Sequence, residues 1–461
     1  MNLTSIARNF MVFVVTALPA HADVVLDWNQ VTSDVLVANS SLQNPGMASR
    51  TMAMVNLAMY DSLAMMKPGG TMFYDHGNGH VSPGMTASGK AAAAKAAHTV
   101  LSAIYPDLQN SLDASLLSSL SNISDGADKS TGIAMGQTIG QSILQRRAND
   151  GYNASSQYLP TNAVGHWQPD PLNPGQEAWG PAWGEMKTFS LHSNTQFMPP
   201  PMPDLTSQAY ADAFNEVKEL GSLNSSTRTT EQTNIGLFWA YDRVGMGTPM
   251  RLFNKVLRTI AIQQGNSEKE NAELFAKASV AMADAGIVAW NSKFEFDLWR
   301  PVTGIRQADQ DGNPLTEADP NWIPLGAPAG GGNDFTPPFP TYLSGHATFG
   351  GALFGTLIEF YGTDNISFEL TSEEVPGMTR TFSSLSEAMA ENGRSRVYLG
   401  IHWNFDDTVG QATGQQIAQF ISGSPFIAAV PEPSMAMLSS MAIVFFVASR
   451  RRVRLEKSPW A

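Results

Sequence analysis

The sequence contains no cysteine and few basic residues. A chain of 461 residues without cysteine cannot form disulfides, thiolate zinc sites or a cysteine nucleophile, so its stability must come from packing. It has 28 lysines and arginines against 41 aspartates and glutamates, which gives a formal net charge of −13. This balance gives little electrostatic support for a nucleic-acid partner. A site for a small anion would have to be locally basic within an acidic protein.

Strand-like alternation is scarce, and no repeat with a period of 20–50 residues is visible. Hydrophobic residues make up 43% of the chain and charged residues 15%, which is ordinary for a globular protein with a substantial core. Apolar residues recur at helical spacing in residues 47–66 and 88–105, and again from residue 207 to 290. The sequence therefore predicts a mostly α protein with long functional loops.

Three stretches lack this helical pattern. Residues 23–46 are mixed, and we expect them to be extended. Residues 151–206 are rich in Pro, Gly, Trp and Asn, which indicates either a linker between two helical halves or a loop layer over a site. A second loop covers residues 307–340. Its acidic run at 309–313 faintly resembles a calcium loop but lacks the remaining EF-hand ligands, so we expect a turn.

Both ends of the sequence have the pattern of targeting signals. Residues 1–22 combine a basic residue, an apolar run and a small-x-small triplet, which predicts a cleaved secretory signal peptide. Residues 430–461 join Val-Pro-Glu-Pro to an apolar run at 435–449 and an arginine cluster, an order that resembles the PEP-CTERM sorting tail of Gram-negative bacteria. The resemblance implies export to the periplasm, outer surface or extracellular matrix. It also implies a transient inner-membrane anchor through residues 435–449 and processing by an exosortase.

The first cluster of candidate functional residues is "WNSKFEFDLWRP", residues 290–301. Lys293 and Arg300 are seven residues apart, about two helical turns, so we expect them on one helical face. Two cations beside aromatic side chains suit an oxyanion, because arginine binds it bidentately and lysine supplies a point charge. A solvated or salt-bridged helix face is the commoner explanation of such a pair.

Two further clusters contain histidine. Ser344-Gly345-His346 follows a proline-rich approach at a predicted helix start, where unpaired N–H groups favour an anion. In "SRVYLGIHWNFDD", residues 395–407, Asp406 lies four residues after His402, a spacing that lets a carboxylate orient an imidazole. A bend near Gly400 is expected, since six residues separate Arg396 from His402.

The three clusters, in this order, resemble the signature motifs of the type 2 phosphatidic-acid phosphatase (PAP2) and vanadium haloperoxidase superfamily. They read Lys-x6-Arg-Pro, Ser-Gly-His and Ser-Arg-x3-Gly-x-His-x3-Asp. Longer stretches within residues 290–410 are similar to the vanadium chloroperoxidase branch. The resemblance implies an all-α fold of two four-helix-bundle-like halves with long irregular loops around the anion site. We expect an N-terminal helical region at 23–206 and a catalytic helical domain at 207–425.

The resemblance also implies roles for individual residues. Five residues would bind the equatorial oxygens of vanadate, or phosphate in the same place: Lys293, Arg300, Ser344, Gly345 and Arg396. His402 would bind vanadium directly, with Asp406 behind it, and His346 would act as acid and base at the apical oxygen. Trp290 and Phe339 resemble the apolar wall of the halide pocket in chloroperoxidases. Leu343 departs from the pattern, since the family usually has Pro before Ser-Gly-His.

Three functions remain open from the sequence. The first is an exported haloperoxidase that uses hydrogen peroxide and halide. The second is a secreted acid phosphatase on the same site, in which His402 attacks the phosphorus of a phosphate ester and His346 protonates the leaving group. The third is a catalytically weak surface or matrix protein that retains the fold. The preferred halide and the oligomeric state do not follow from the sequence.

Overall fold

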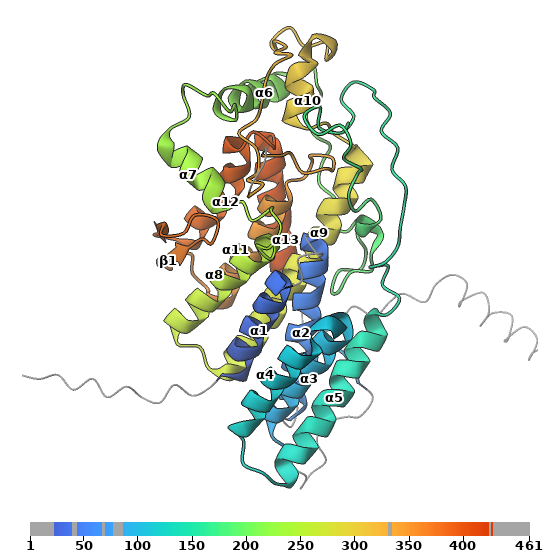
Figure 1. Ribbon diagram of the computed structural model, residues 1–461, viewed down its shortest axis with the longest axis vertical. Helices are drawn as coiled ribbons and strands as arrows, with labels where there is room; N and C mark the ends of the chain where they lie inside the picture. The colour runs from blue at the N-terminus through green and yellow to red at the C-terminus, as the bar shows by residue number, and fades with distance from the viewer. Residues whose placement is uncertain are drawn as a thin grey trace, which may run out of the picture.

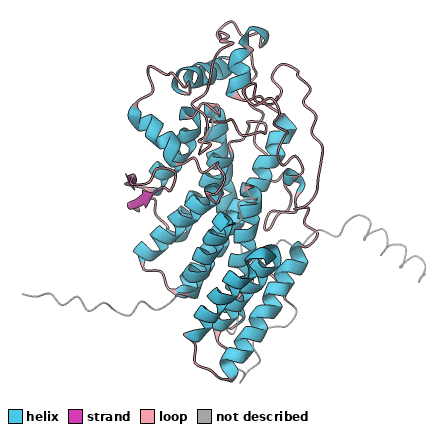
Figure 2. Ribbon diagram, viewed as in Figure 1, coloured by secondary structure: helices cyan, strands magenta, loops and turns pink. Residues whose placement is uncertain are grey.

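The computed structural model describes residues 23–38, 44–66, 70–76, 86–330, 334–423 and 426. The predicted signal peptide and sorting tail, with the apolar run at 435–449, lie outside the described residues. Within the described part, nearly all regular structure is helical (Figure 2), so the predicted all-α class is confirmed. No helix among these residues has the length and apolar character needed to cross a membrane.

The helices follow one another along the chain as shown in Figure 1. They are α1 (Val24–Ala38), α2 (Pro45–Met65), α3 (Gly89–Ile104), α4 (Gln109–Ser121), α5 (Ala127–Arg147), α6 (Gln208–Leu220), α7 (Thr230–Phe238), α8 (Thr248–Gln264), α9 (Glu268–Phe296), α10 (Pro301–Arg306), α11 (Gly345–Tyr361), α12 (Leu385–Tyr398) and α13 (Asn404–Gly423). Short 3₁₀ helices are η1 (Pro106–Leu108), η2 (Trp183–Glu185) and η3 (Ala308–Gln310). An antiparallel hairpin joins β1 (Phe368–Thr371) to β2 (Thr379–Phe382).

Helix α1 contradicts the expectation that residues 23–46 are extended. The Asp23 side chain accepts hydrogen bonds from the backbone N–H groups of Val25 (2.9 Å) and Leu26 (3.1 Å), which satisfies two free donors of the first turn. Trp28 and Val35 of this helix are buried, seven residues apart on one face. The extended prediction was wrong because this stripe is interrupted by polar residues that are themselves buried, including Asn29.

The N-terminal bundle is held by very close helix packing. Helix α3 is rich in alanine and α5 presents glycines to it. A Cβ atom on Gly136 of α5 would lie 2.1 Å from the backbone oxygen of Ala92 in α3. The two backbones therefore approach more closely than side chains would allow, so alanine and glycine are required at this crossing.

The long helix α9 connects the N-terminal group of helices, which includes α2 to α5, with the group that includes α6 to α13. It begins in a capping box between Ser267 and Glu270 and packs against α2 on one side and α11 and α13 on the other. In Figure 1, α3, α4 and α5 lie at one end of the molecule and α6, α7 and α10 at the other. The division of the chain at residues 206 and 207 stays a prediction.

The long segment 151–206 is a loop layer against the second group of helices. Its anchor is Asp284 of α9, a fully buried carboxylate that accepts backbone hydrogen bonds from Phe189 (2.6 Å), Ser190 (2.8 Å) and Leu191 (3.0 Å). Burial raises the pKa of Asp284 to about 6. One side chain thus accepts backbone hydrogen bonds that a helix or sheet would satisfy elsewhere.

Replacing Asp284 with asparagine is expected to lower the free energy of unfolding by about 1–3 kcal/mol, because the amide nitrogen cannot accept and leaves a buried N–H unpaired. Denaturant unfolding of the variant measures this loss. Asp212→Asn, on the exposed face of α6, serves as control and should stay within about 0.5 kcal/mol of the native protein. Equal stability of both variants would contradict the anchoring role.

The acidic run in the second loop begins in the 3₁₀ helix η3 and then bends at Asp311. The Asp311 side chain accepts a hydrogen bond from the Asn313 N–H at 2.7 Å and another from the Thr316 hydroxyl at 2.8 Å. No group of three or more His, Asp or Glu that could hold a metal ion occurs among the described residues. The carboxylates of this loop therefore close it on itself.

Candidate active site

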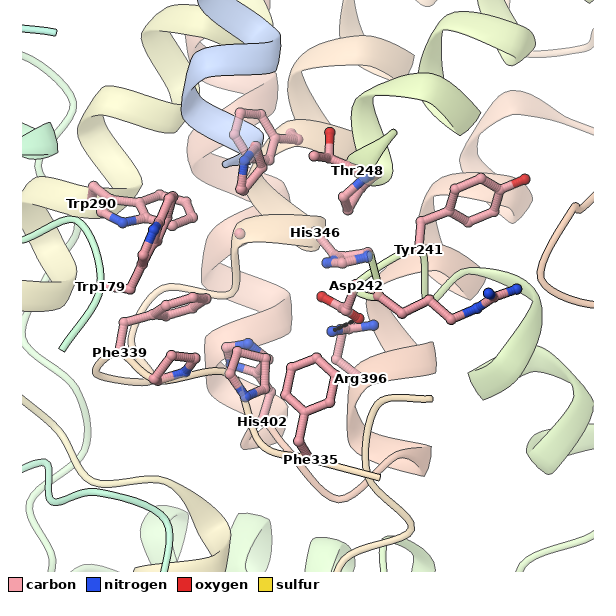
Figure 3. Close-up of a pocket in the computed structure, with 17 residues that line it drawn as sticks. Trp179, Tyr241, Asp242, Thr248, Trp290, Phe335, Phe339, His346, Arg396 and His402 are labelled. Carbon is pink, nitrogen blue, oxygen red and sulfur yellow. Dashed lines mark hydrogen bonds and ion pairs between the residues drawn. The ribbon is translucent and has the colours of Figure 1, made fainter. Parts of the chain in front are cut away.

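A cavity of about 190 Å³ opens where the loop layer meets the start of α11. Its polar end holds His346, His402, Arg396, Asp242 and the backbone of Gly345, and its remaining walls are mostly aromatic and proline side chains (Figure 3). These residues come from segments far apart in the sequence. The structure therefore brings the second and third clusters together at one site.

The first cluster joins this site by a different route from the one expected. Lys293 lies in the last turn of α9, and Arg300 is the residue that precedes α10. Asp297 ends α9 in the left-handed conformation, with φ of 51°. The expectation that both cations share one helical face was wrong, because the chain turns between them. The turn is fixed by His166, whose Nδ1 lies 2.8 Å from the Asp297 carboxylate.

Lys293 holds the approach to the Ser-Gly-His motif. Its ammonium is fully buried and donates to three backbone oxygens, those of Pro340 (3.1 Å), Thr341 (3.0 Å) and Leu343 (2.5 Å). Burial, followed by the nearby Arg300, lowers the pKa of Lys293. Leu343 is itself fully buried, so its backbone is held by this lysine although it lacks the proline ring of the family pattern.

Arg300 connects the aromatic wall to the histidine. Its Nε donates to the Phe339 oxygen at 2.8 Å, and its Nη1 donates to the Ile401 oxygen at 2.7 Å and to His402 Nε2 at 3.0 Å. Burial lowers the pKa of Arg300 to about 9. Since arginine only donates, His402 must accept through Nε2 and carry its proton on Nδ1.

His402 is oriented from behind by a carboxylate, as the spacing predicted. Its Nδ1 lies 2.8 Å from Asp406 Oδ2 and 3.0 Å from the Thr341 hydroxyl, which itself donates to Asp406. Burial and the positive charge of Arg300 hold the pKa of His402 well below its usual value, and burial raises the pKa of Asp406 to about 7. The imidazole is thus neutral and turns its Nε2 lone pair toward the arginine side of the site.

The Ser-Gly-His motif begins a helix, as predicted. Ser344 caps α11, and Gly345 is the first helical residue. The backbone N–H of Ser344 donates to the backbone carbonyl oxygen of Asp406 at 3.1 Å. The free N–H groups of this first turn add donors to the site. His346 Nε2 lies 3.0 and 2.9 Å from the carbonyl oxygens of Trp239 and Ala240. The proton is therefore on Nε2, which leaves Nδ1 as the acceptor.

Both arginines keep buried donors that no group among the described residues satisfies. Arg396 pairs with Asp242 through Nη2 at 2.7 Å, while its Nε and Nη1 are buried without a partner in the described part of the chain. Arg300 Nη2 is also buried without a partner there. Unpaired buried donors cost free energy, more so for a charged group. Together with a helix N-terminus they form a donor set that fits a tetrahedral oxyanion such as vanadate or phosphate.

The predicted halide wall also lies at this cavity. The rings of Trp290 and Phe339 are 5.2 Å apart between centroids, and Trp179 of the loop layer packs against both. Lys293 Nζ lies 4.9 Å and the Arg300 guanidinium carbon 4.8 Å from the Phe339 ring centroid. An apolar surface backed by two cations suits a weakly hydrated anion.

Sequence reasoning missed three residues of the site. Asp242, Thr341 and Trp179 contact the predicted residues as described above. Asp242 stands in "AYDRV", which has no distinguishing spacing, and Trp179 lies in a loop without periodicity. Thr341 stands two residues after Phe339, in the proline-rich approach to Ser344-Gly345-His346, and its hydroxyl could have been considered as a partner for the histidine.

Comparison with known proteins gives the class of this fold and site. Residues 273–424 match the model of the VCPO second helical-bundle domain. Two solved structures have the same fold. A bacterial vanadium-dependent iodoperoxidase superposes with a TM-score of 0.70 at 26% identity and covers 87% of this chain and 95% of its own. A holo-type bacterial vanadium-dependent chloroperoxidase superposes with a TM-score of 0.64 at 17% identity. This match covers 83% of this chain and 92% of the chloroperoxidase chain. The chain is similar to vanadium haloperoxidases in sequence and in fold, and the resemblance seen in the three motifs is confirmed.

Among curated proteins, the chain is 39% identical over 310 residues to the vanadium chloroperoxidase of Curvularia inaequalis. The match covers 54% of this chain and 50% of that relative. The chain therefore spans about half the length of the curated relative that it matches.

Proposed function

We propose that this protein is a vanadium-dependent haloperoxidase, which oxidises halide with hydrogen peroxide at a histidine-bound vanadate. The observation that carries the proposal is the set of unpaired buried donors on Arg300 and Arg396 beside a neutral His402. The sequence match to a vanadium chloroperoxidase and the likeness to a vanadium-dependent iodoperoxidase structure support the same chemistry. When bound, vanadate would supply the activation of peroxide for two-electron oxidation of halide.

The cationic and backbone donors would hold the oxyanion. Arg300, Arg396 and the first N–H groups of α11 would donate to its oxygens, together with the Ser344 hydroxyl. Lys293 would contribute its charge while it keeps the 340–343 backbone in place. Because these groups are buried and fixed before the anion arrives, little reorganisation opposes binding.

The two histidines would have different tasks because their protons are fixed differently. His402, with Nδ1–H held by Asp406, would offer to the metal the Nε2 lone pair that accepts from Arg300 in the anion-free site. His346 donates Nε2–H to backbone and keeps Nδ1 free to accept a proton at the cavity. Burial, followed by the charge of Arg396, lowers the pKa of His346 to about 4. The ring is therefore uncharged at neutral pH, and its Nδ1 can accept a proton.

The test of the proposed function compares purified, anion-stripped protein with and without added vanadate. Peroxide-dependent oxidation of bromide or chloride that requires vanadate is the expected result. Hydrolysis of a phosphate ester that vanadate inhibits, without halide oxidation, would favour the phosphatase. Absence of both activities in protein that still binds phosphate would favour a matrix protein that retains the fold.

Replacing Arg396 with alanine is expected to weaken phosphate or vanadate binding about ten- to a hundredfold, because a charge-assisted hydrogen bond to a buried anion is lost. Isothermal titration of either anion measures this effect. Arg394→Ala on the same helix is the matched control, since Arg394 pairs instead with Glu216 and Asn404. Equal anion affinity of both variants would place the oxyanion elsewhere.

We propose further that the protein is exported and processed at both ends. The patterns of residues 1–22 and 430–461 support this proposal. Mass spectrometry of the protein from cell fractions should find a product outside the cytoplasm that lacks both segments. A cytoplasmic product with intact ends would contradict it.

A further inference from the structure

The first part of the connection from α7 to α8, here called the wall segment (residues 239–243), touches two members of the anion site. The carbonyl oxygens of its first two residues lie 3.0 and 2.9 Å from His346 Nε2. Its Asp242 forms the 2.7 Å ion pair with Arg396. The position of the wall segment therefore sets the direction of the His346 ring and of the Arg396 guanidinium.

The wall segment has a strained backbone. Tyr241 has a φ of 53°, in the left-handed region that residues other than glycine rarely adopt. Its side chain is fully buried, and in Figure 3 the ring points away from His346. Such a conformation persists only where surrounding contacts hold it, so the contacts of Tyr241 have to offset this strain.

The first residues after strand β1 supply those contacts. The Tyr241 hydroxyl accepts a hydrogen bond from the Glu373 N–H at 2.8 Å and donates to the carboxylate of the same residue. Arg243 Nε donates to Glu374 Oε2 at 2.7 Å, and this carboxylate is almost fully buried. Ser372 donates to the backbone at the end of α7 at 2.7 Å. Glu373 and Glu374 thus bind the wall segment itself, and Ser372 binds the helix end that precedes it.

We propose that residues 372–374 position the proton-accepting histidine and the anion-binding arginine through the wall segment. Tyr241, Glu373 and Glu374 are positioning residues in this account, since they act through Asp242 and the two carbonyl oxygens. Only the turnover readout rests on the proposed function. The anion-binding readout does not depend on which reaction the site performs.

The test is Tyr241→Phe, which removes one hydroxyl and keeps the ring. Inorganic phosphate is titrated into vanadate-free protein, and the ring nitrogens of His346 are followed by ¹⁵N NMR, with His346→Gln for assignment. We expect phosphate affinity and kcat each to fall about tenfold or more, because small displacements of a positioned group cost this much. The His346 signals should lose the pattern of a ring protonated at Nε2.

Tyr361→Phe is the matched control, since its hydroxyl donates to Asn266 at 3.1 Å at the far end of α11. Glu374→Gln carries the same test if Tyr241→Phe fails to fold. Unchanged phosphate affinity and unchanged His346 signals in a folded variant would overturn the proposal and leave the hairpin a role in stability alone. Both changes in a protein that never oxidises halide would uphold the positioning role and refute the haloperoxidase function.

Discussion

His402→Ala is expected to abolish halide oxidation and phosphate-ester hydrolysis together. In the proposed function the Nε2 lone pair would be the metal ligand of the first reaction, and in the phosphatase alternative it would be the nucleophile of the second. Asp406 and Arg300, which both contact the ring, cannot take its place, because Asp406 lies behind it at Nδ1 and Arg300 has no lone pair to give. Steady-state assays of both reactions should show a loss of at least about a thousandfold, the scale seen when a covalent catalytic group is removed.

We expect the fold to be unchanged by this substitution. A control variant and a phosphate titration distinguish loss of the catalytic group from loss of the fold. His192→Ala, on the exposed loop layer, is the control and should keep full activity. Phosphate should still bind His402→Ala with reduced affinity, since the arginine donors remain. Retained halide oxidation in folded His402→Ala would overturn the assignment of the site.

Gly414→Ala is expected to produce the largest loss of stability. Helices α11 and α13 cross with their backbones in contact, and a Cβ atom on Gly414 would lie 2.2 Å from the Thr348 oxygen and 2.5 Å from the Ala352 nitrogen. Backbone atoms cannot move aside as a flexible side chain would, so the helices must separate. We expect a loss of about 3 kcal/mol or more in the free energy of unfolding, the upper end for overpacking.

The same substitution should reduce anion binding, because Ser344 and His346 begin α11 while Asp406 begins α13. Denaturant unfolding and phosphate titration measure the two effects. Gly423→Ala is the control, since a Cβ atom there would meet nothing within 4 Å. A Gly414→Ala protein as stable as the control would show that the crossing is looser than the structure has it.

Much of the site could be predicted because its residues stand in short, ordered motifs. The spacing of His402 and Asp406 and the helix start at Ser344 depend on local geometry, and both are confirmed. The turn at Asp297 could not be predicted from spacing, since nothing in the aromatic-rich stretch around it marks this aspartate as left-handed. Asp242 was missed because its partner Arg396 is 154 residues away, and only the tertiary fold joins them.

The fold class could be predicted from helical periodicity, but helix α1 and the anchoring of the loop layer could not. Helix α1 buries polar residues among its apolar ones, so its sequence lacks the contrast between faces that identifies an amphipathic helix. The anchoring of the loop layer depends on Asp284, a charged residue in the apolar centre of α9. Asp284 stabilises the fold by accepting hydrogen bonds from backbone N–H groups of a distant segment, and no local sequence pattern predicts these contacts.

The members of the anion site stand at helix ends and not at helix centres. Lys293 is in the last turn of α9 and Arg396 in that of α12, Arg300 and Ser344 immediately precede helices, and Asp406 is in the first turn of α13. The site therefore depends on where helices start and stop, and only weakly on the length of the chain between them. Doubling a flexible connection costs only about 0.6 kcal/mol. Insertions in the connecting loops can therefore change the entrance to the cavity, and so which molecules reach it, without altering the groups that bind the anion.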